Sequence, residues 1–86
     1  MSEQEIGRVT HYFARLGVAV LSLTGALSVG DRIHVHGRST DLQQSVDSMQ
    51  IEHQSVTQVG PGQEVALRVS QRVREGDLVY RVTLNG

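Results

Sequence analysis

The stretch LSVGDRIHV, residues 27–35, is echoed near the end of the chain by VREGDLVYRV, residues 73–82. In both copies a Gly-Asp pair comes directly before a run in which apolar residues recur. Glycine adopts positive φ without steric cost, and an aspartate side chain accepts hydrogen bonds from nearby backbone N–H groups, so the pair is typical of a tight turn. A catalytic carboxylate would need a partner group within hydrogen-bond reach, and neither copy has one nearby in the sequence. We therefore predict that both pairs are structural turns leading into strands: Gly30, Asp31, Gly76 and Asp77.

Alternating apolar residues predict short strands on either side of these turns. The expected strands are Ile6–Phe13, Val18–Leu23, Asp31–Gly37, Glu64–Ser70 and Leu78–Leu84, with turns at Arg15–Gly17 and Val56–Gln63. The second strand is apolar on both faces, so we expect it to be central. Short strands separated by turn signals are typical of a small all-β barrel or sandwich. Closure into a barrel is favoured because it removes the edges that would pair with other chains.

The segment Thr40–Val56 allows two interpretations. Leu42, Val46 and Met49 have the spacing of one helix face. Alternatively, Met49 and Ile51 alternate as in a strand, and Val46 fits that pattern only if a bulge shifts its phase. The pattern alone leaves both interpretations open.

Composition limits the classes of protein to consider. A chain of 86 residues forms a single domain, residues 1–86, and its formal net charge of −1 excludes a bulk polycation. The absence of Cys excludes disulfides and thiol chemistry. The polar first residues do not resemble a signal peptide, and no apolar run approaches the ~20 residues that span a bilayer. We therefore expect a cytoplasmic protein without a membrane partner.

The basic residues are all arginine, and they concentrate towards the end of the chain. Residues 65–86 hold four Arg and two acidic residues. Arginine binds phosphate groups through two parallel hydrogen bonds, although a solvated protein face would have the same composition. The candidate nucleic-acid-binding residues are Arg68, Arg72, Arg74 and Arg81.

The histidines are the other candidates for chemistry. His34 and His36 lie two residues apart, so one strand face would present both, and His11 or His53 could supply a third metal ligand. An exposed polar strand face explains the same residues without a metal. The chain has neither a Gly-x-Ser-x-Gly nucleophile elbow nor a phosphate-binding Gly-Lys-Ser/Thr motif. We predict no catalytic residue, no metal, no cofactor and no nucleotide hydrolysis.

The order of these motifs resembles the second-domain β-barrel of translational GTPases such as elongation factor Tu. An even closer resemblance is to the C-terminal barrel of the collagenase-like peptidase family, some members of which act in tRNA modification; SMQIEH (residues 48–53) and REGDLVY (residues 74–80) are typical of it. The segments that carry the first resemblance are Gly7-Arg8-Val9, Gly25 to Ile33, Val46 to Gln50, Gly62 to Leu67 and Gly76 to Val79.

These resemblances imply a fold and a function. The implied fold is an all-β, closed, antiparallel Greek-key-type barrel of about six to seven strands, of the translation-factor domain 2 type, in which Met49 lies on a strand. The implied function is that of a non-enzymatic binding module for the translation apparatus, with the ribosome (rRNA), tRNA or a translation factor as partner. The alternative is an accessory subunit that binds a separately encoded enzyme, such as a collagenase-like peptidase or tRNA-modification protein.

Overall fold

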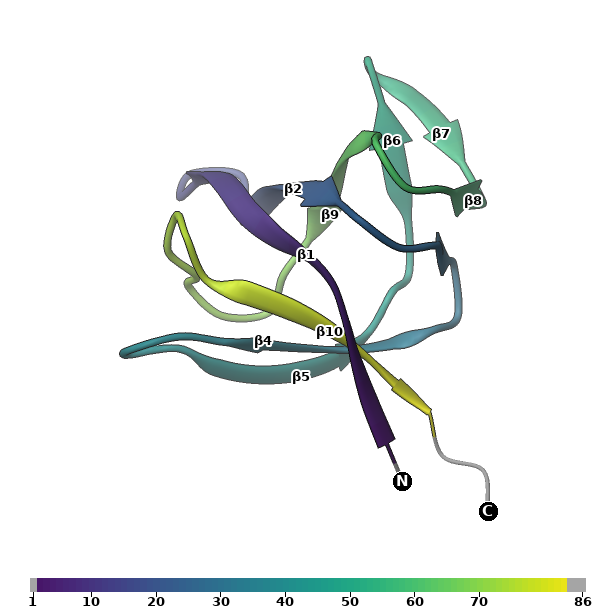
Figure 1. Ribbon diagram of the computed structural model, residues 1–86. Coiled ribbons are helices and arrows are strands. Elements are labelled where there is room, and N and C mark those ends of the chain that lie inside the picture. The colour runs from purple at the N-terminus through teal and green to yellow at the C-terminus, as the bar shows by residue number, and fades with distance from the viewer. Residues whose placement is uncertain (1, 84–86) are drawn as a thin grey trace.

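The computed structural model describes residues 2–83, and these residues form strands and connecting loops without a helix (Figure 1). Accordingly, this part of the chain contains no helix of the length and apolarity needed to cross a membrane. The ten strands are β1 (Ser2–Phe13), β2 (Val18–Leu23), β3 (Leu27–Ser28), β4 (Arg32–His36), β5 (Asp41–Ser45), β6 (Met49–Ile51), β7 (Gln54–Val56), β8 (Gln58–Val59), β9 (Glu64–Arg68) and β10 (Leu78–Thr83).

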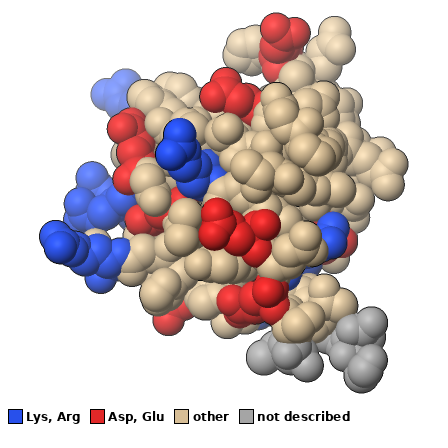
Figure 2. Space-filling model, viewed as in Figure 1, with Lys and Arg blue, Asp and Glu red and all other residues tan. Residues whose placement is uncertain are grey.

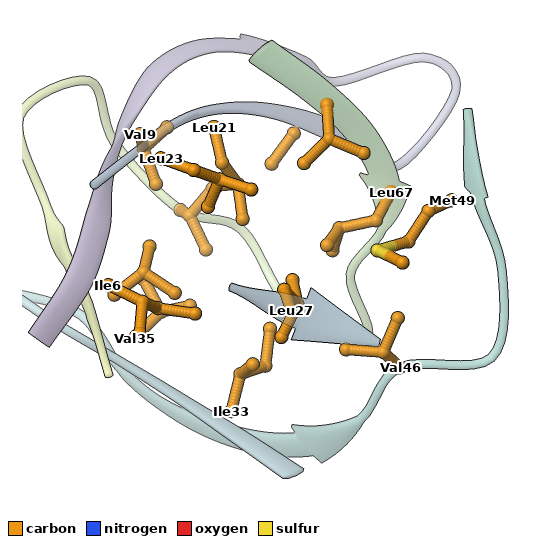
Figure 3. Packing of buried hydrophobic residues seen from close by; sticks show 14 of the residues in the cluster. Ile6, Val9, Leu21, Leu23, Leu27, Ile33, Val35, Val46, Met49 and Leu67 are labelled. Atoms are coloured by element: carbon orange, nitrogen blue, oxygen red, sulfur yellow. The ribbon is translucent and has the colours of Figure 1, made fainter. Parts of the chain in front are cut away.

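Eight of the strands form one antiparallel sheet in the order β5-β4-β10-β1-β2-β9-β6-β7, and β3 pairs with β8 in a separate ribbon. The sheet curves around the core, so that side chains from distant strands point towards one another (Figure 3). The predicted all-β, antiparallel class is confirmed. The second strand is central as expected, because β2 lies between β1 and β9.

The core consists of aliphatic side chains from nearly every strand, without Phe or Tyr among its fully buried members. Alternation along the strands places these side chains inside, as in β2, where Ala19, Leu21 and Leu23 are buried and the residues between them are half-buried. Burying each such side chain stabilises the fold by about 1.5–3 kcal/mol. The largest fully buried side chains are those of Ile6, Leu21, Leu23, Leu27, Ile33 and Met49.

Strand β1 is longer than the expected strand Ile6–Phe13 because it serves two neighbours. Its first half pairs with β10 and its second half pairs with β2, with shifts of register at Glu5/Gly7 and Val9/His11. Residues 2–5 are polar and exposed, so hydrophobic alternation gave no signal for them. Gly7 lies where the two pairings overlap, opposite both Val79 and Leu23.

The first Gly-Asp pair lies in a tight turn before β4. Asp31 N–H donates to the Ser28 carbonyl (3.0 Å), and Asp31 Oδ2 accepts from Ser28 N–H (2.9 Å). Gly30 has φ +96°, which is the backbone conformation that favours glycine. The turn is fastened to Val46, whose carbonyl accepts from Gly30 N–H (2.8 Å) and whose N–H donates to the Asp31 carbonyl (2.8 Å).

The second pair repeats this arrangement before β10. Asp77 N–H donates to the Arg74 carbonyl (3.1 Å), Asp77 Oδ2 accepts from Arg74 N–H (2.9 Å), and Gly76 has φ +92°. Here the buried partner is Val9, whose carbonyl accepts from Gly76 N–H (2.8 Å) and whose N–H donates to the Asp77 carbonyl (2.8 Å). The structure thus places all four Gly-Asp residues in turns, each anchored to a buried valine.

The two turn-and-strand units repeat one pattern of strand pairing. β4 and β10 are antiparallel neighbours, with His34 opposite Tyr80 at the middle of the pair. β5 flanks β4 on one side, and the first half of β1 flanks β10 on the other. Each turn is also bonded to a valine that follows the flanking segment, so the pattern repeats on both sides of the His34–Tyr80 pair.

The expected closed barrel is corrected in two respects. The structure has ten strands, and its hydrogen-bonded ladder within residues 2–83 stays open, with β5 and β7 as the sheet edges. The ladder breaks after β5 because the backbone of Val46 bonds to the turn at Gly30 and Asp31 and not to another strand. The Gln44 side chain spans the gap to the end of β9: its Nε2 donates to the Arg68 carbonyl (2.7 Å), and its Oε1 accepts from Ser70 N–H (2.8 Å).

The ambiguous segment 40–56 forms strands β5, β6 and β7, so the strand interpretation of Met49 is confirmed and the helical one is wrong. The helix-like spacing arises because Leu42 in β5, Val46 in the connection and Met49 in β6 are all buried. The expected turn at residues 56–63 also needs correction, because it contains the short strand β8, which pairs with β3. Leu84, the last residue of the expected final strand, lies outside the described residues.

Candidate functional site

The four candidate nucleic-acid-binding arginines lie on three separate elements. Arg68 is exposed at the end of β9, and Arg72 and Arg74 are exposed in the loop before β10. Arg81 is half-buried on β10, where Nη1 donates to the Ala26 carbonyl (3.1 Å) and Nη2 donates to Gln4 Oε1 (3.2 Å). Arg81 is therefore held by bonds within the chain.

Positive and negative side chains are mixed on the visible face of the molecule (Figure 2). On the face shown in Figure 2, Arg side chains stand mostly at the left-hand side of the molecule, with Asp and Glu side chains directly beside them. A nucleic-acid surface gains affinity from phosphate neutralisation by adjacent cations, and interspersed carboxylates oppose it. The RNA-binding interpretation of Arg68, Arg72, Arg74 and Arg81 stays a prediction.

The histidines do not converge. His34 and His36 lie on the same face of β4 with ring centroids 5.5 Å apart, whereas His11 pairs with Glu75 (3.4 Å) and His53 lies in the β6–β7 turn. Within residues 2–83, no group of three or more His, Asp and Glu side chains is arranged to hold a metal ion.

His34 is bonded on both sides by carboxylates. Its Nδ1 lies 2.9 Å from Glu3 Oε2, its Nε2 lies 2.6 Å from Asp41 Oδ1, and its side chain is 15% exposed. Burial lowers the pKa of His34, but the hydrogen bonds and charges of Glu3 and Asp41 outweigh burial and raise the pKa above its ordinary value of 6.5. Glu3 lies opposite Val82 and Asp41 lies opposite His36, so the two carboxylates hold corresponding positions in the repeated pattern. Sequence reasoning missed this cluster because Glu3 lies outside the expected first strand.

We expect the stability of the protein to fall as the pH rises above about 6.5. A folded-state pKa that lies above the unfolded value gives stability that is fully present below the unfolded pKa and is lost as the pH rises through the folded pKa. Urea midpoints measured from pH 6 to pH 9 should therefore decrease, and His34→Gln should flatten that decrease. His36→Gln, on the same strand, serves as the control. An unchanged pH profile in His34→Gln would show that the cluster does not contribute.

An apolar groove lies between the β1–β2 hairpin and the β6–β7 hairpin, with a volume of about 480 Å³. Phe13 and Leu16 at the hairpin tip are 44% and 67% exposed. The neighbouring Tyr12 packs against the core, so of this adjacent aromatic pair only one ring faces outwards. Its lining includes the half-buried Val18, Val20 and Ala66 and also the exposed Glu52 and Glu64, which we call its rim. We call this surface the acidic groove.

Comparison with known proteins gives consistent matches. No family model matches the chain. The chain is 39% identical over 77 residues to the uncharacterized protease MJ0090 of Methanocaldococcus jannaschii, and 36% identical over 78 residues to a collagenase of Porphyromonas gingivalis. Each match covers 88% of this chain but only 19% and 22%, respectively, of the relative, so the chain spans about a fifth of the length of the curated relatives it matches.

The fold has a counterpart among solved structures. The crystal structure of the C-terminal domain of a "putative U32 peptidase" from Geobacillus thermoleovorans superimposes with a TM-score of 0.85, at 17% identity, over 91% of both chains. These matches support the resemblance to collagenase-like peptidases and give no support to the translation-factor assignment. Over most of its length the chain is therefore similar to one segment of proteins named as proteases and collagenases, and it has the fold of a U32 peptidase C-terminal domain.

Proposed function

We propose that this chain is a non-catalytic accessory domain that associates with the catalytic part of a collagenase-like peptidase. The observation that carries the proposal is the sequence identity of 36–39% to a segment that makes up about a fifth of a protease and a collagenase. The remaining four-fifths of each relative is absent from the match and is large enough to hold a separate catalytic domain. Supplied as a separate chain, the domain should bind this catalytic part.

The chemistry of the described surface supports binding more than catalysis. Both ring nitrogens of His34 bond to carboxylates, so neither is free to take a proton from a substrate. The carboxylates of Asp31 and Asp77 accept hydrogen bonds from backbone N–H groups in their turns. The exposed apolar side chains beside the acidic groove are features of a surface that contacts another protein.

A capture experiment tests the proposal. The tagged chain, cross-linked in its native cells and recovered under denaturing conditions, should carry a collagenase-like peptidase as the enriched protein. Purified together, the two should form a stoichiometric complex, and the isolated chain should not cleave gelatin. Enrichment of ribosomal proteins and RNA without a peptidase would overturn the proposal in favour of the translation apparatus, and gelatin cleavage by the isolated chain would overturn the non-catalytic role.

A further inference from the structure

We propose that the acidic groove is the docking surface for a protein segment that presents an apolar side chain next to a Lys or Arg. This inference rests on the proposed function, because the segment would belong to the catalytic part of the peptidase. Beyond that function, the inference names the surface of this chain that makes the contact and the kind of residues that the partner presents to it.

The apolar character of the groove is the first observation. Leu16 is 67% exposed at the hairpin tip, and Phe13 beside it is 44% exposed. Val18 and Val20 continue the same apolar surface along β2 and are half-buried. Single exposed apolar residues are ordinary, but a contiguous apolar surface next to a groove marks a contact site. The groove therefore suits an inserted apolar side chain.

The negative charge of the rim indicates which residue of the partner should lie beside the inserted apolar side chain. Glu52 and Glu64 are both exposed where they line the groove, and the groove lining includes no Lys or Arg. Within residues 2–83, neither carboxylate forms a salt bridge. Charge complementarity across an interface guides encounter and suppresses wrong partners. A basic residue next to the inserted apolar side chain matches this rim.

The backbone at the rim is also unusual. Glu52 and His53 form the two-residue turn between β6 and β7, and both have positive φ (50° and 67°). Such hairpin turns prefer Asn-Gly because positive φ is unfavourable for residues with larger side chains. Strain of this kind clusters at ligand clamps, and here it accompanies two polar side chains that line the groove.

The same rim argues against other occupants. Two carboxylates repel the phosphates of RNA, so nucleic acid is disfavoured at this surface. A second copy docking groove to groove would bring Glu52 and Glu64 of both copies together, since a two-fold contact places the same surface on each side. The observations therefore favour a different protein segment with opposite charge.

Photo-cross-linking tests the contact in the cell. A photo-reactive amino acid is placed singly at Leu16, at Glu52, and at exposed Gln43 on β5 as the control position. We expect adducts of the peptidase from Leu16 and Glu52 but not from Gln43, on a peptide with a Lys or Arg beside an apolar residue. Peptidase adducts from Gln43 alone would overturn the groove and leave the proposed function standing. Peptidase recovered with the unmodified tagged chain but from none of the three positions would overturn the groove alone. Failure to recover the peptidase in both experiments would overturn the proposed function and the groove together. An adduct between two copies of this chain would show self-association and overturn the proposed partner.

Matched variants give the quantitative measure, with the purified peptidase as the binding probe. Leu16→Ser should weaken the complex about tenfold, whereas Val29→Ser, at a site 39% exposed outside the groove, should not. The double variant Glu52→Gln/Glu64→Gln should reduce the dependence of affinity on salt, and Glu75→Gln in the loop before β10 should leave it unchanged. These side chains are exposed, and unchanged melting temperatures will show that each variant is folded. Equal losses from Leu16→Ser and Val29→Ser would contradict the proposal.

Discussion

Replacing Gly7 with alanine is expected to lower the free energy of unfolding by about 3 kcal/mol or more. A Cβ at this position would overlap the carbonyl oxygen of Ser22 and lie 3.2 Å from Leu23 Cα. Both contacts are with the backbone of β2, so no side-chain rotation relieves them. To relieve the overlap, β1 would have to move away from β2 at a residue that also pairs with β10. The movement would disturb both the β1–β2 and the β1–β10 hydrogen bonds. Total stabilities of domains are about 5–15 kcal/mol, so this loss would be a large share of the stability of the protein.

Urea unfolding followed by circular dichroism measures this effect, and Gly60→Ala is its matched control. A Cβ at Gly60 would meet no atom closer than Gln63 Oε1 at 4.0 Å, so its midpoint should change little. A Gly7→Ala protein with an unchanged midpoint would show that β1 and β2 are not held in this register.

The second large effect is expected from Gly37→Ala, which should cost about 2 kcal/mol. A Cβ at Gly37 would overlap Oδ1 of Asp77 and lie 2.7 Å from its Cγ. Asp77 cannot easily turn aside, because its side chain is buried and its Oδ2 accepts the hydrogen bond from Arg74 N–H. The added methyl group should therefore displace the carboxylate and loosen the turn before β10.

A double-mutant cycle isolates this mechanism. Asp77→Ala alone should cost about 1 kcal/mol, as the loss of a capping carboxylate does. In the Asp77→Ala background the obstructing oxygen is gone, so Gly37→Ala should cost much less than in the native protein, with a coupling of about 1 kcal/mol or more. Strictly additive losses would mean that Gly37→Ala acts on the β4–β5 connection alone.

The turns and the core-facing positions could be predicted because both leave local signals. The Gly-Asp pairs marked two turns, and alternation identified the strands β2, β4 and β9. The choice of strand over helix for the segment around Met49 needed the resemblance to known proteins. In this segment, Leu42, Val46 and Met49 are buried on two short strands and the loop between them, and their spacing in the sequence is the same as that of one helix face.

The remaining features depend on contacts between residues far apart in the sequence. The first residues of β1 are polar, and only their pairing with β10 makes them a strand. The bond of Gln44 to Arg68 and Ser70 crosses about 25 residues of chain, and no local pattern distinguishes it from the adjacent Gln43. The acidic groove joins two hairpins, and Glu3 meets His34 across 31 residues. Such sites become visible only when the fold is known.

The pairing of β1 with β10 brings Ser2 opposite Thr83, so the two ends of the described chain are neighbours. A short linker could therefore join them, and new ends could be opened at the exposed Gly60-Pro61-Gly62 turn. In such a circular permutant the pairing of β1 with β10 becomes that of a hairpin, which lowers the entropy lost on closing the longest loop of the native connectivity. Because folding rates rise as contacts become more local, the same architecture would be reached by a faster route.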